Sequence, residues 1–173
     1  FVLKADEAAH LVKKKGTDCY KKLVTLMSAD ILAEDGQIDK AKMASRIFSD
    51  KELLDKVNSV IHPAVKEYIL DLIEDKRNED KYDYFFIEAA LLIEDGYENI
   101  CDELWYVYAS VETRFMRLKA SRDYPDGKIR AIMSAQLSEE EFRRHCRRVI
   151  DNDGDRDRTL ESLRDALKHC KKG

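Results

Sequence analysis

Three polar side chains, Asp6, Glu88 and Asn152, each follow an apolar run that is typical of a strand. Ligands of open parallel sheets bind beyond the carboxyl ends of the strands, so we expect these side chains along one edge of a sheet. A carboxylate there could take a proton from a substrate hydroxyl or help to hold a hydrated cation. Asp6 is the first candidate, although an aspartate that only caps a helix has the same sequence signature. Glu88 has the same alternative, as an ordinary strand end or cap.

Arginine is concentrated between Arg114 and Arg148, in a charged segment that is predicted to be helical and broken at residues 124–127. Guanidinium groups clamp phosphates and stabilise charge on a transferring phosphoryl group, and a broken helical pair would suit a lid. Most charged side chains on such helices face water, and the glutamates at 139–141 are close enough to pair with several arginines. We expect a functional role for Arg122, which lies just before the break.

The histidines are weaker candidates. His10 lies one helical turn after Asp6, and His62 precedes Pro63, where it most simply packs and hydrogen-bonds at a helix start. Neither histidine has partners at the spacing of metal ligands, and the four cysteines form no CxxC pair. We therefore expect structural or substrate-contact roles for His10 and His62 rather than metal binding.

The composition limits the class of protein. With 173 residues and 44% hydrophobic content, the chain can bury one substantial core, which predicts one α/β domain with an inserted subdomain. A formal net charge of only -4 argues against a general nucleic-acid binder. No apolar run approaches the roughly 18 residues that span a bilayer, and no signal peptide is visible, so we expect a cytoplasmic protein with no membrane partner.

The predicted elements alternate between strands and helices, which is typical of a parallel, doubly wound sheet. Asp6 is expected to cap a first helix that runs to about Lys15, and the last helix is expected to bury three leucines at helical spacing. Strands are predicted at residues 1–5, 84–87, 104–108 and 149–150, and the last helix at residues 157–169.

Residues 17–78 contain more helical pattern than a simple crossover needs, with turn signals at residues 34–36 and at His62-Pro63. Asp39 is expected to cap one helix, Ser49-Asp50 precedes another, and Pro63 is expected to open a third. We interpret this segment as an inserted helical subdomain. The expected division is a core at residues 1–16, 82–111 and 148–173, a helical subdomain at 17–81 and a lid at 112–147.

The phosphate loop that a nucleotide kinase of this layout needs, G-x-x-x-x-G-K-[ST], does not occur in the sequence. The chain opens with Phe1-Val2-Leu3, which already has the pattern of a strand with no preceding turn. We therefore expect that an upstream segment with the loop is missing from this sequence. An intact mass compared with the encoding gene would test that hypothesis.

Several ordered segments, which together span nearly the whole chain, resemble the dephospho-coenzyme A kinase family. Two positions depart from the family's usual residues, because Lys4 replaces an acidic residue and Ala90 replaces a proline. The matching segments are VLKAD at 2–6 with His10, DGQID at 35–39, RIF at 46–48, NSVIHP at 58–63, EAALLIE at 88–94, ET at 112–113, RD at 122–123, Gln136 and VIDN at 149–152.

The resemblance implies an α/β fold, namely a three-layer parallel sheet of the P-loop nucleoside monophosphate kinase type with a helical coenzyme A subdomain and a helical lid. It implies transfer of the ATP γ-phosphate to the ribose 3′-hydroxyl of dephospho-CoA, with Mg²⁺, in the last step of coenzyme A biosynthesis. By position, Asp6 matches the catalytic aspartate, Arg122 matches the lid arginine at the nucleotide, and Asn152 lies in the loop that borders the adenine. The implied acceptor contacts are His10, His62, Pro63, Glu88 and Leu91.

Two other functions stay open at this point. A related small-molecule kinase would act on another nucleoside or sugar hydroxyl, which a panel of substrates would reveal. A relative without the phosphate loop would bind a coenzyme A-type ligand or a partner without catalysis, and an upstream G-x-x-x-x-G-K-[ST] would exclude it. We expect a monomer or a weak homo-oligomer.

Overall fold

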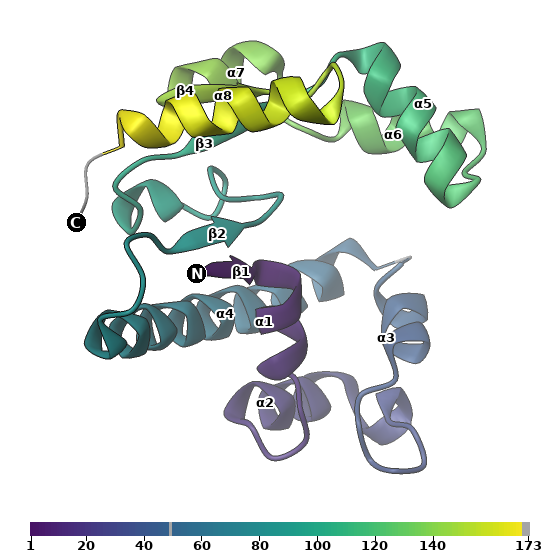
Figure 1. Cartoon of the computed structure of the whole chain (residues 1–173). Coiled ribbons are helices and arrows are strands. Elements are labelled where there is room, and N and C mark those ends of the chain that lie inside the picture. Colours follow the sequence, from purple (N-terminus) through teal and green to yellow (C-terminus); the bar gives the residue numbers. More distant parts are fainter. Residues whose placement is uncertain (49, 171–173) are drawn as a thin grey trace. The chain divides into compact units, whose positions relative to one another are not determined.

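The computed structural model describes residues 1–48 and 50–170, which form two compact units (Figure 1). The first unit covers Phe1–Leu91 and the second begins at Leu92. The chain is mixed α/β, as predicted, and its strands pair in parallel. The larger predicted sheet is not seen among the described residues, whose named strands form two separate two-stranded sheets, one in each unit.

The first unit is mostly helical. Helices α1, α2 and α3 all pack against α4, so the long helix is the support on which the others are placed. Its elements are β1 (Val2–Lys4), α1 (Ala5–Leu11), α2 (Asp18–Met27), the short 3₁₀ helix η1 (Ala29–Ile31), α3 (Lys40–Ile47), α4 (Lys51–Glu79) and β2 (Phe86–Glu88). The largest side chains buried in its core are Leu23, Met27, Ile31, Val57 and Ile69.

The sheet of the first unit joins the two ends of this helical segment. β1 and β2 pair in parallel, with Val2 opposite Phe86 and Lys4 opposite Glu88. Leu3 is the buried residue of β1 and anchors the strand, while its two neighbours are exposed. Because both strands end at the same level, the residues that follow them meet at one edge of the sheet.

Two predicted helix starts are confirmed and one predicted cap is wrong. The Asp39 side chain accepts hydrogen bonds from two backbone amides of α3, at 2.8 and 3.0 Å, and Asp50 accepts one from α4 at 2.9 Å. Ser49 lies outside the described residues. Asp6 does not cap α1, because Lys4 occupies the N-cap position and the helix begins at Ala5. Asp6 lies instead in the first turn, where the helix dipole favours a negative charge.

Helix α1 ends at Leu11 rather than near Lys15 as predicted. Thr17 explains the early end, because its hydroxyl donates to the Val12 carbonyl at 2.5 Å and accepts from the first turn of α2 at 3.1 Å. The chain reverses between these two residues, and Gly16 takes a left-handed conformation with φ 100°. Residues 12–17, which were expected to extend α1, therefore form the turn that leads into the cap of α2.

Helix α4 is continuous across Pro63, so the predicted turn at His62-Pro63 and the predicted helix start there are wrong. A proline inside a helix removes one backbone hydrogen bond and costs about 3 kcal/mol. Burial of apolar side chains on both sides of the proline offsets that cost. The buried residues are Val57, Val65 and Ile69, whose spacings of eight and four residues put them on one face of the helix. Tertiary packing thus overrides the local signal.

The second unit carries the other sheet. β3 and β4 pair in parallel, with Trp105 opposite Arg148 and Tyr108 opposite Asp151, and α8 packs on β4. Ile129 and Ile150 are fully buried, while the three predicted leucines of the last helix are only half-buried. The elements are η2 (Tyr97–Asn99), β3 (Trp105–Tyr108), α5 (Val111–Arg122), α6 (Asp126–Ser134), α7 (Glu139–His145), β4 (Arg148–Asp151) and α8 (Arg156–Lys168).

The predicted break in the arginine-rich segment is confirmed, and a second break lies at residues 135–138. Helix α6 already begins at Asp126, so Gly127 lies in its first turn and not in the break. The second break ends in a capping box: the Ser138 hydroxyl accepts from the Glu141 amide at 3.2 Å, and the Glu141 carboxylate accepts from the Ser138 amide at 3.0 Å. This Ser-x-x-Glu pattern is a helix start signal that the sequence analysis missed.

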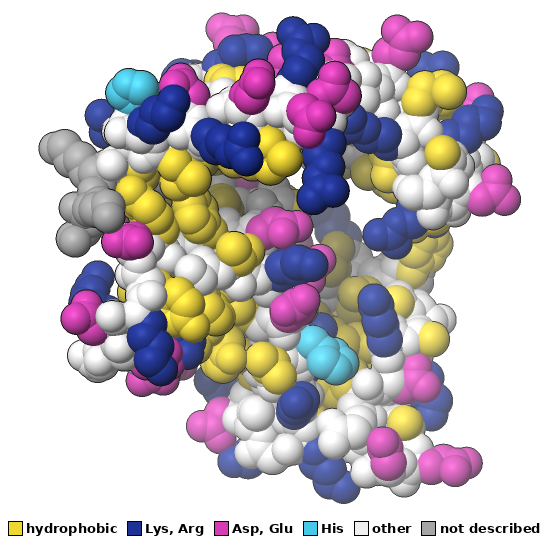
Figure 2. All heavy atoms as spheres, viewed as in Figure 1, with side chains coloured by type: hydrophobic (Ala, Val, Ile, Leu, Met, Phe, Trp, Pro, Cys, Tyr) yellow, Lys and Arg dark blue, Asp and Glu magenta, His cyan; other side chains and the backbone are white. Residues whose placement is uncertain are grey.

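Charged side chains of both signs are interspersed over α7 and α8 (Figure 2). The predicted pairing among the glutamates at 139–141 is confirmed for Glu139, whose Oε1 lies 2.8 Å from Nε of Arg143. Within the described residues, no helix combines the length and apolar character that a membrane span requires.

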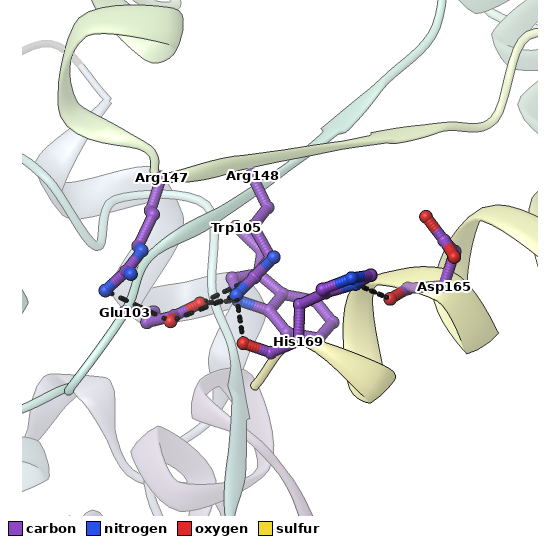
Figure 3. A network of polar contacts seen from close by, with 6 residues as sticks. All are labelled: Glu103, Trp105, Arg147, Arg148, Asp165 and His169. Carbon is purple, nitrogen blue, oxygen red and sulfur yellow. Dashed lines mark hydrogen bonds and ion pairs between the residues drawn. The ribbon is translucent and has the colours of Figure 1, made fainter. Parts of the chain in front are cut away.

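The Glu103 carboxylate holds the amino ends of β3 and β4 together (Figure 3). The Glu103 side chain, only 7% exposed, accepts hydrogen bonds from Arg148 Nε at 2.7 Å and from Trp105 Nε1 at 3.0 Å, and Arg147 Nη1 lies 3.3 Å away. Arg148 also donates to the carbonyl of His169, just after α8, at 2.7 Å. One carboxylate therefore connects both strands to the last helix.

Replacing Glu103 with glutamine is expected to lower the melting temperature by several degrees at neutral pH and to flatten its dependence on acid pH. The hydrogen bond from Arg148 lowers the pKa of the Glu103 carboxyl below its ordinary value of 4.5. Between the folded pKa and 4.5, the unfolded state binds more protons, so wild-type stability is lost as the pH falls through this range. Thermal unfolding measured from neutral pH downward checks the result.

Glu161→Gln is the control for this change, because Glu161 is an exposed glutamate on α8 of the same unit. We expect the control to follow the wild-type melting profile. A Glu103→Gln profile that also follows the wild type would mean that the Glu103 carboxylate contributes nothing to stability.

Candidate active site

The first unit brings two predicted site residues to one sheet edge. Glu88 is the last residue of β2 and lies opposite Lys4, the last residue of β1. Asp6 follows β1 by two residues, in the first turn of α1, and both carboxylates are exposed. The predicted placement of Asp6 and Glu88 at the carboxyl ends of neighbouring strands is therefore confirmed, whereas their functional roles stay predictions.

A cavity of about 480 Å³ lies beside Asp6. His10 also lines it, because positions four apart on α1 share one helix face. Glu7 and Leu11 complete the contribution of α1, and Lys40 comes from the first residue of α3. The predicted neighbours Asp6 and His10 thus line a common cavity that sequence periodicity could anticipate.

Lys40 is the lining residue that the sequence analysis missed. No motif distinguishes it from the other lysines of the chain, and its position depends on how α3 is placed against α4. The available local signal is the cap at Asp39, which fixes where α3 begins and hence where Lys40 projects. A cap locates a helix start in the sequence but does not say what lies opposite it in space.

A second lysine lies in the electrostatic neighbourhood of this cavity. Burial lowers the pKa of the Lys13 ammonium below its ordinary value of 10.5, and the positive charge of Lys40 lowers it further. The Cys19 thiolate, where it forms, and the Asp6 carboxylate act on the Lys13 pKa in the opposite direction. Lys13, Lys40 and Asp6 therefore form one interacting group of charges.

The other predicted acceptor contacts of this unit are more dispersed along the chain. His62 is half-buried and Pro63 is exposed, both inside α4, and Leu91 is exposed just beyond β2. None of these three is among the described residues that line the cavity at Asp6. Their substrate-contact roles stay predictions.

Asn152 follows β4 at the carboxyl end of the second unit's sheet, whereas Asp6 and Glu88 lie at the separate sheet of the first unit. The single edge predicted for all three side chains is therefore not seen among the described residues. The Asn152 backbone amide donates to the Tyr108 carbonyl at the end of β3, at 2.8 Å, and its side-chain oxygen accepts from the Thr159 hydroxyl at 3.3 Å. The next residue, Asp153, accepts from the Ser110 amide at 2.8 Å. The loop around Asn152 is therefore fixed to both β3 and α8, which gives its side chain a defined position.

Arg122 is exposed at the last position of α5, which ends where Asp123 adopts a left-handed conformation. Lys119 bridges the break to Asp126 of α6 at 3.0 Å. A second hydrogen bond at 2.9 Å connects Arg114 of α5 to Gln136, just after α6. Two polar contacts thus hold α5 and α6 as a helical hairpin with Arg122 at its turn. The predicted position of Arg122 before the break is confirmed.

The arrangement defines which chemistry the described side chains could perform. An exposed carboxylate beside a cavity can accept a proton from a bound hydroxyl. Asp6 and Glu88 supply oxygen donors of the kind that Mg²⁺ prefers, and Mg²⁺ sites in phosphotransferases commonly use one or two carboxylates together with substrate phosphates. An arginine at the turn of a helical hairpin can stabilise negative charge on a transferring group.

Comparison with known proteins assigns this chain to a family of kinases. The chain belongs to the dephospho-CoA kinase family, whose family model matches residues 1–158. A dephospho-CoA kinase of Streptococcus pyogenes serotype M3 is 30% identical over 168 residues, a match that covers 96% of this chain and 83% of that protein. A dephospho-CoA kinase of Listeria innocua is 33% identical over 159 residues, covering 92% of this chain and 79% of that protein.

Two solved structures resemble the fold. The crystal structure of TT1252 from Thermus thermophilus aligns with a TM-score of 0.77 and 26% identity, covering 98% of this chain and 84% of that one. The dephospho-CoA kinase from Campylobacter jejuni aligns with a TM-score of 0.70, covering 96% of this chain and 83% of that one, and its 21% identity supports the fold alone. The resemblance stated from ordered sequence segments is therefore confirmed.

Proposed function

We propose that this protein phosphorylates dephospho-CoA, transferring the γ-phosphate of ATP to the ribose 3′-hydroxyl. The observation that carries the proposal is the family match over residues 1–158. The cavity that Asp6 and His10 line supports the proposal, because an acceptor needs a concave site with a proton acceptor beside it.

In the proposed mechanism, Asp6 accepts the proton of the attacking 3′-hydroxyl while the γ-phosphoryl group leaves ADP. Little covalent chemistry falls to the protein in such a transfer, so positioning and charge stabilisation supply most of the rate enhancement. Arg122 stabilises the charge that develops on the transferring group, and Asn152 borders the adenine of the nucleotide. His10, His62, Pro63, Glu88 and Leu91 contact the acceptor.

Mg²⁺ is part of this proposal. The carboxylates of Asp6 and Glu88 fit it chemically as hard oxygen donors at neighbouring strand ends. When bound, the ion neutralises phosphate charge during transfer. Asp6 and Glu88 would hold the ion, and both side chains are exposed to solvent.

The proposed architecture is the three-layer parallel sheet of P-loop nucleoside monophosphate kinases. Residues 1–16, 82–111 and 148–173 would form the core, residues 17–81 the acceptor subdomain and residues 112–147 the lid. The helical content of α2, α3 and α4 supports the second part, and the hairpin of α5 and α6 supports the third. We further propose a cytoplasmic protein that is a monomer or a weak homo-oligomer.

Protein expressed from the complete gene is expected to convert dephospho-CoA and ATP into coenzyme A and ADP, with a strict need for Mg²⁺. Mass spectrometry of the product locates the new phosphate, and a coupled assay for ADP gives the rate. Adenosine and ribose serve as comparison acceptors. Preference for either of them over dephospho-CoA would favour a kinase for another hydroxyl, and tight binding of dephospho-CoA without any ADP would favour a non-catalytic binding protein.

A further inference from the structure

The cavity at Asp6 has an acidic wall and a cationic wall. Asp6 and Glu7 come from the first turn of α1, and Lys40 lies at the first residue of α3. All three residues are exposed. Two carboxylates on their own would repel an anionic acceptor, so Lys40 supplies the attraction that such a ligand needs.

The position of Lys40 carries an electrostatic cost. Its charge lowers the pKa of the Lys13 ammonium, which means that the two cations repel each other. Lysine at the first position of a helix is also placed unfavourably in the field of the helix dipole. An anion bound beside Lys40 would relieve the repulsion between the two lysines and would turn an unfavourable arrangement into a favourable one.

The chemistry of the acceptor matches these two walls. Dephospho-CoA carries its reacting hydroxyl and its diphosphate on the same ribose, so a molecule that presents the hydroxyl to Asp6 must hold its negative charges a short distance away. The cavity at Asp6 is open to solvent, and its volume of about 480 Å³ can receive part of a ligand of nucleotide size. A compact ammonium group is a common partner for phosphate oxygens.

We propose that Lys40 binds the diphosphate of the acceptor and thereby positions the ribose hydroxyl at Asp6. This inference rests on the proposed function and adds to it a residue that determines acceptor affinity. Lys40 acts through charge on a part of the acceptor that does not react, so its contribution is made equally in the ground state and in the transition state. Such uniform binding changes KM and leaves kcat largely unaffected.

Lys40→Ala in the full-length protein is expected to raise the dissociation constant and the KM for dephospho-CoA about 10- to 100-fold, the range for a lost charge-assisted contact. The KM for ATP and kcat should stay within about twofold. Lys40→Arg should restore most of the affinity, because it keeps the charge. Calorimetric titration with dephospho-CoA and steady-state kinetics measure these quantities.

Lys51→Ala is a matched control, since Lys51 is likewise the exposed first residue of a helix in the first unit and follows an aspartate cap at Asp50. Both substitutions remove the same charge from the same helix position, so they should affect stability alike. Lys51→Ala should leave dephospho-CoA binding unchanged. Equal losses in the two variants, or unchanged binding in Lys40→Ala, would overturn the assignment of Lys40.

The binding measurement separates this inference from the proposed function. If the wild-type protein binds dephospho-CoA in a manner that depends on Lys40 but forms no coenzyme A, the phosphoryl-transfer proposal fails and the contact stands. If the wild type forms coenzyme A and Lys40→Ala has the wild-type KM for dephospho-CoA, the contact fails and the function stands.

Discussion

Asp6→Asn is expected to reduce kcat for phosphorylation of dephospho-CoA by about 10²- to 10⁴-fold, the usual contribution of a general base. The amide keeps the shape of the side chain at the sheet edge but cannot accept the hydroxyl proton. Asp6 makes no capping hydrogen bond in α1, so the substitution should disturb the helix little. Binding of ATP, measured by calorimetry, should remain close to that of the wild type.

The control for Asp6 is Asp18→Asn, which also removes an exposed carboxylate from the first turn of a helix in the first unit. Both changes give up a favourable interaction with a helix dipole, and Asp18→Asn also removes the exposed ion pair with Lys21 at 2.8 Å. The melting temperature of Asp18→Asn therefore gives an upper bound on the structural cost expected for Asp6→Asn. We expect Asp18→Asn to keep wild-type turnover. An Asp6→Asn enzyme with wild-type turnover would show that Asp6 is not the base.

For Arg122→Ala, kcat is expected to fall by about 10³-fold, as for arginines that stabilise transferring phosphoryl groups in other enzymes. Arg122 is exposed at the end of α5, and the hairpin of α5 and α6 is held by Lys119 and Arg114. Removing Arg122 should therefore leave the hairpin folded. Single-turnover kinetics at saturating ATP and dephospho-CoA measure the transfer step itself.

Arg77→Ala is the control that shows how much stability is lost when an arginine is removed from the last turn of a helix. Arg77 lies in the last turn of α4, which ends at Asp80 with the same left-handed geometry that ends α5 at Asp123, φ 49° and ψ 37°. Both arginines interact favourably with the carboxyl end of a helix, so the two alanine variants should lose similar stability. A fall in melting temperature without a fall in kcat for Arg122→Ala would make Arg122 a structural residue.

The strands and their polar ends could be predicted from the sequence because their signals are local. The runs before Glu88 and Asn152 are short and apolar with a polar stop, and the structure places both residues at the carboxyl ends of parallel strands. The caps at Asp39 and Asp50 are equally local, since each side chain bonds to amides two or three positions away. Such signals do not depend on how distant segments are folded.

The features that were missed depend on distant segments. Helix α4 passes through Pro63 because Val57 and Ile69 are buried against helices that lie earlier in the chain, which no local window contains. Lys40 lines the cavity because α3 packs beside α4. Asp6 and Lys40 are far apart in the sequence, so no local pattern indicates that they line the same cavity. The order of the matching segments along the chain indicated the family, but it did not indicate which lysine lines the cavity at Asp6.

The parallel pairing of β1 with β2 also determines the order in which the first unit folds. The backbone hydrogen bond from the Phe86 amide to the Phe1 carbonyl, 2.8 Å long, joins residues 85 positions apart, whereas the Glu103–Arg148 contact spans 45 positions. Closing a longer loop costs more chain entropy, and contacts distant in sequence slow folding. β1 leaves the ribosome long before its partner exists, so we expect the helices around α4 to form first and this strand pair to complete the unit last.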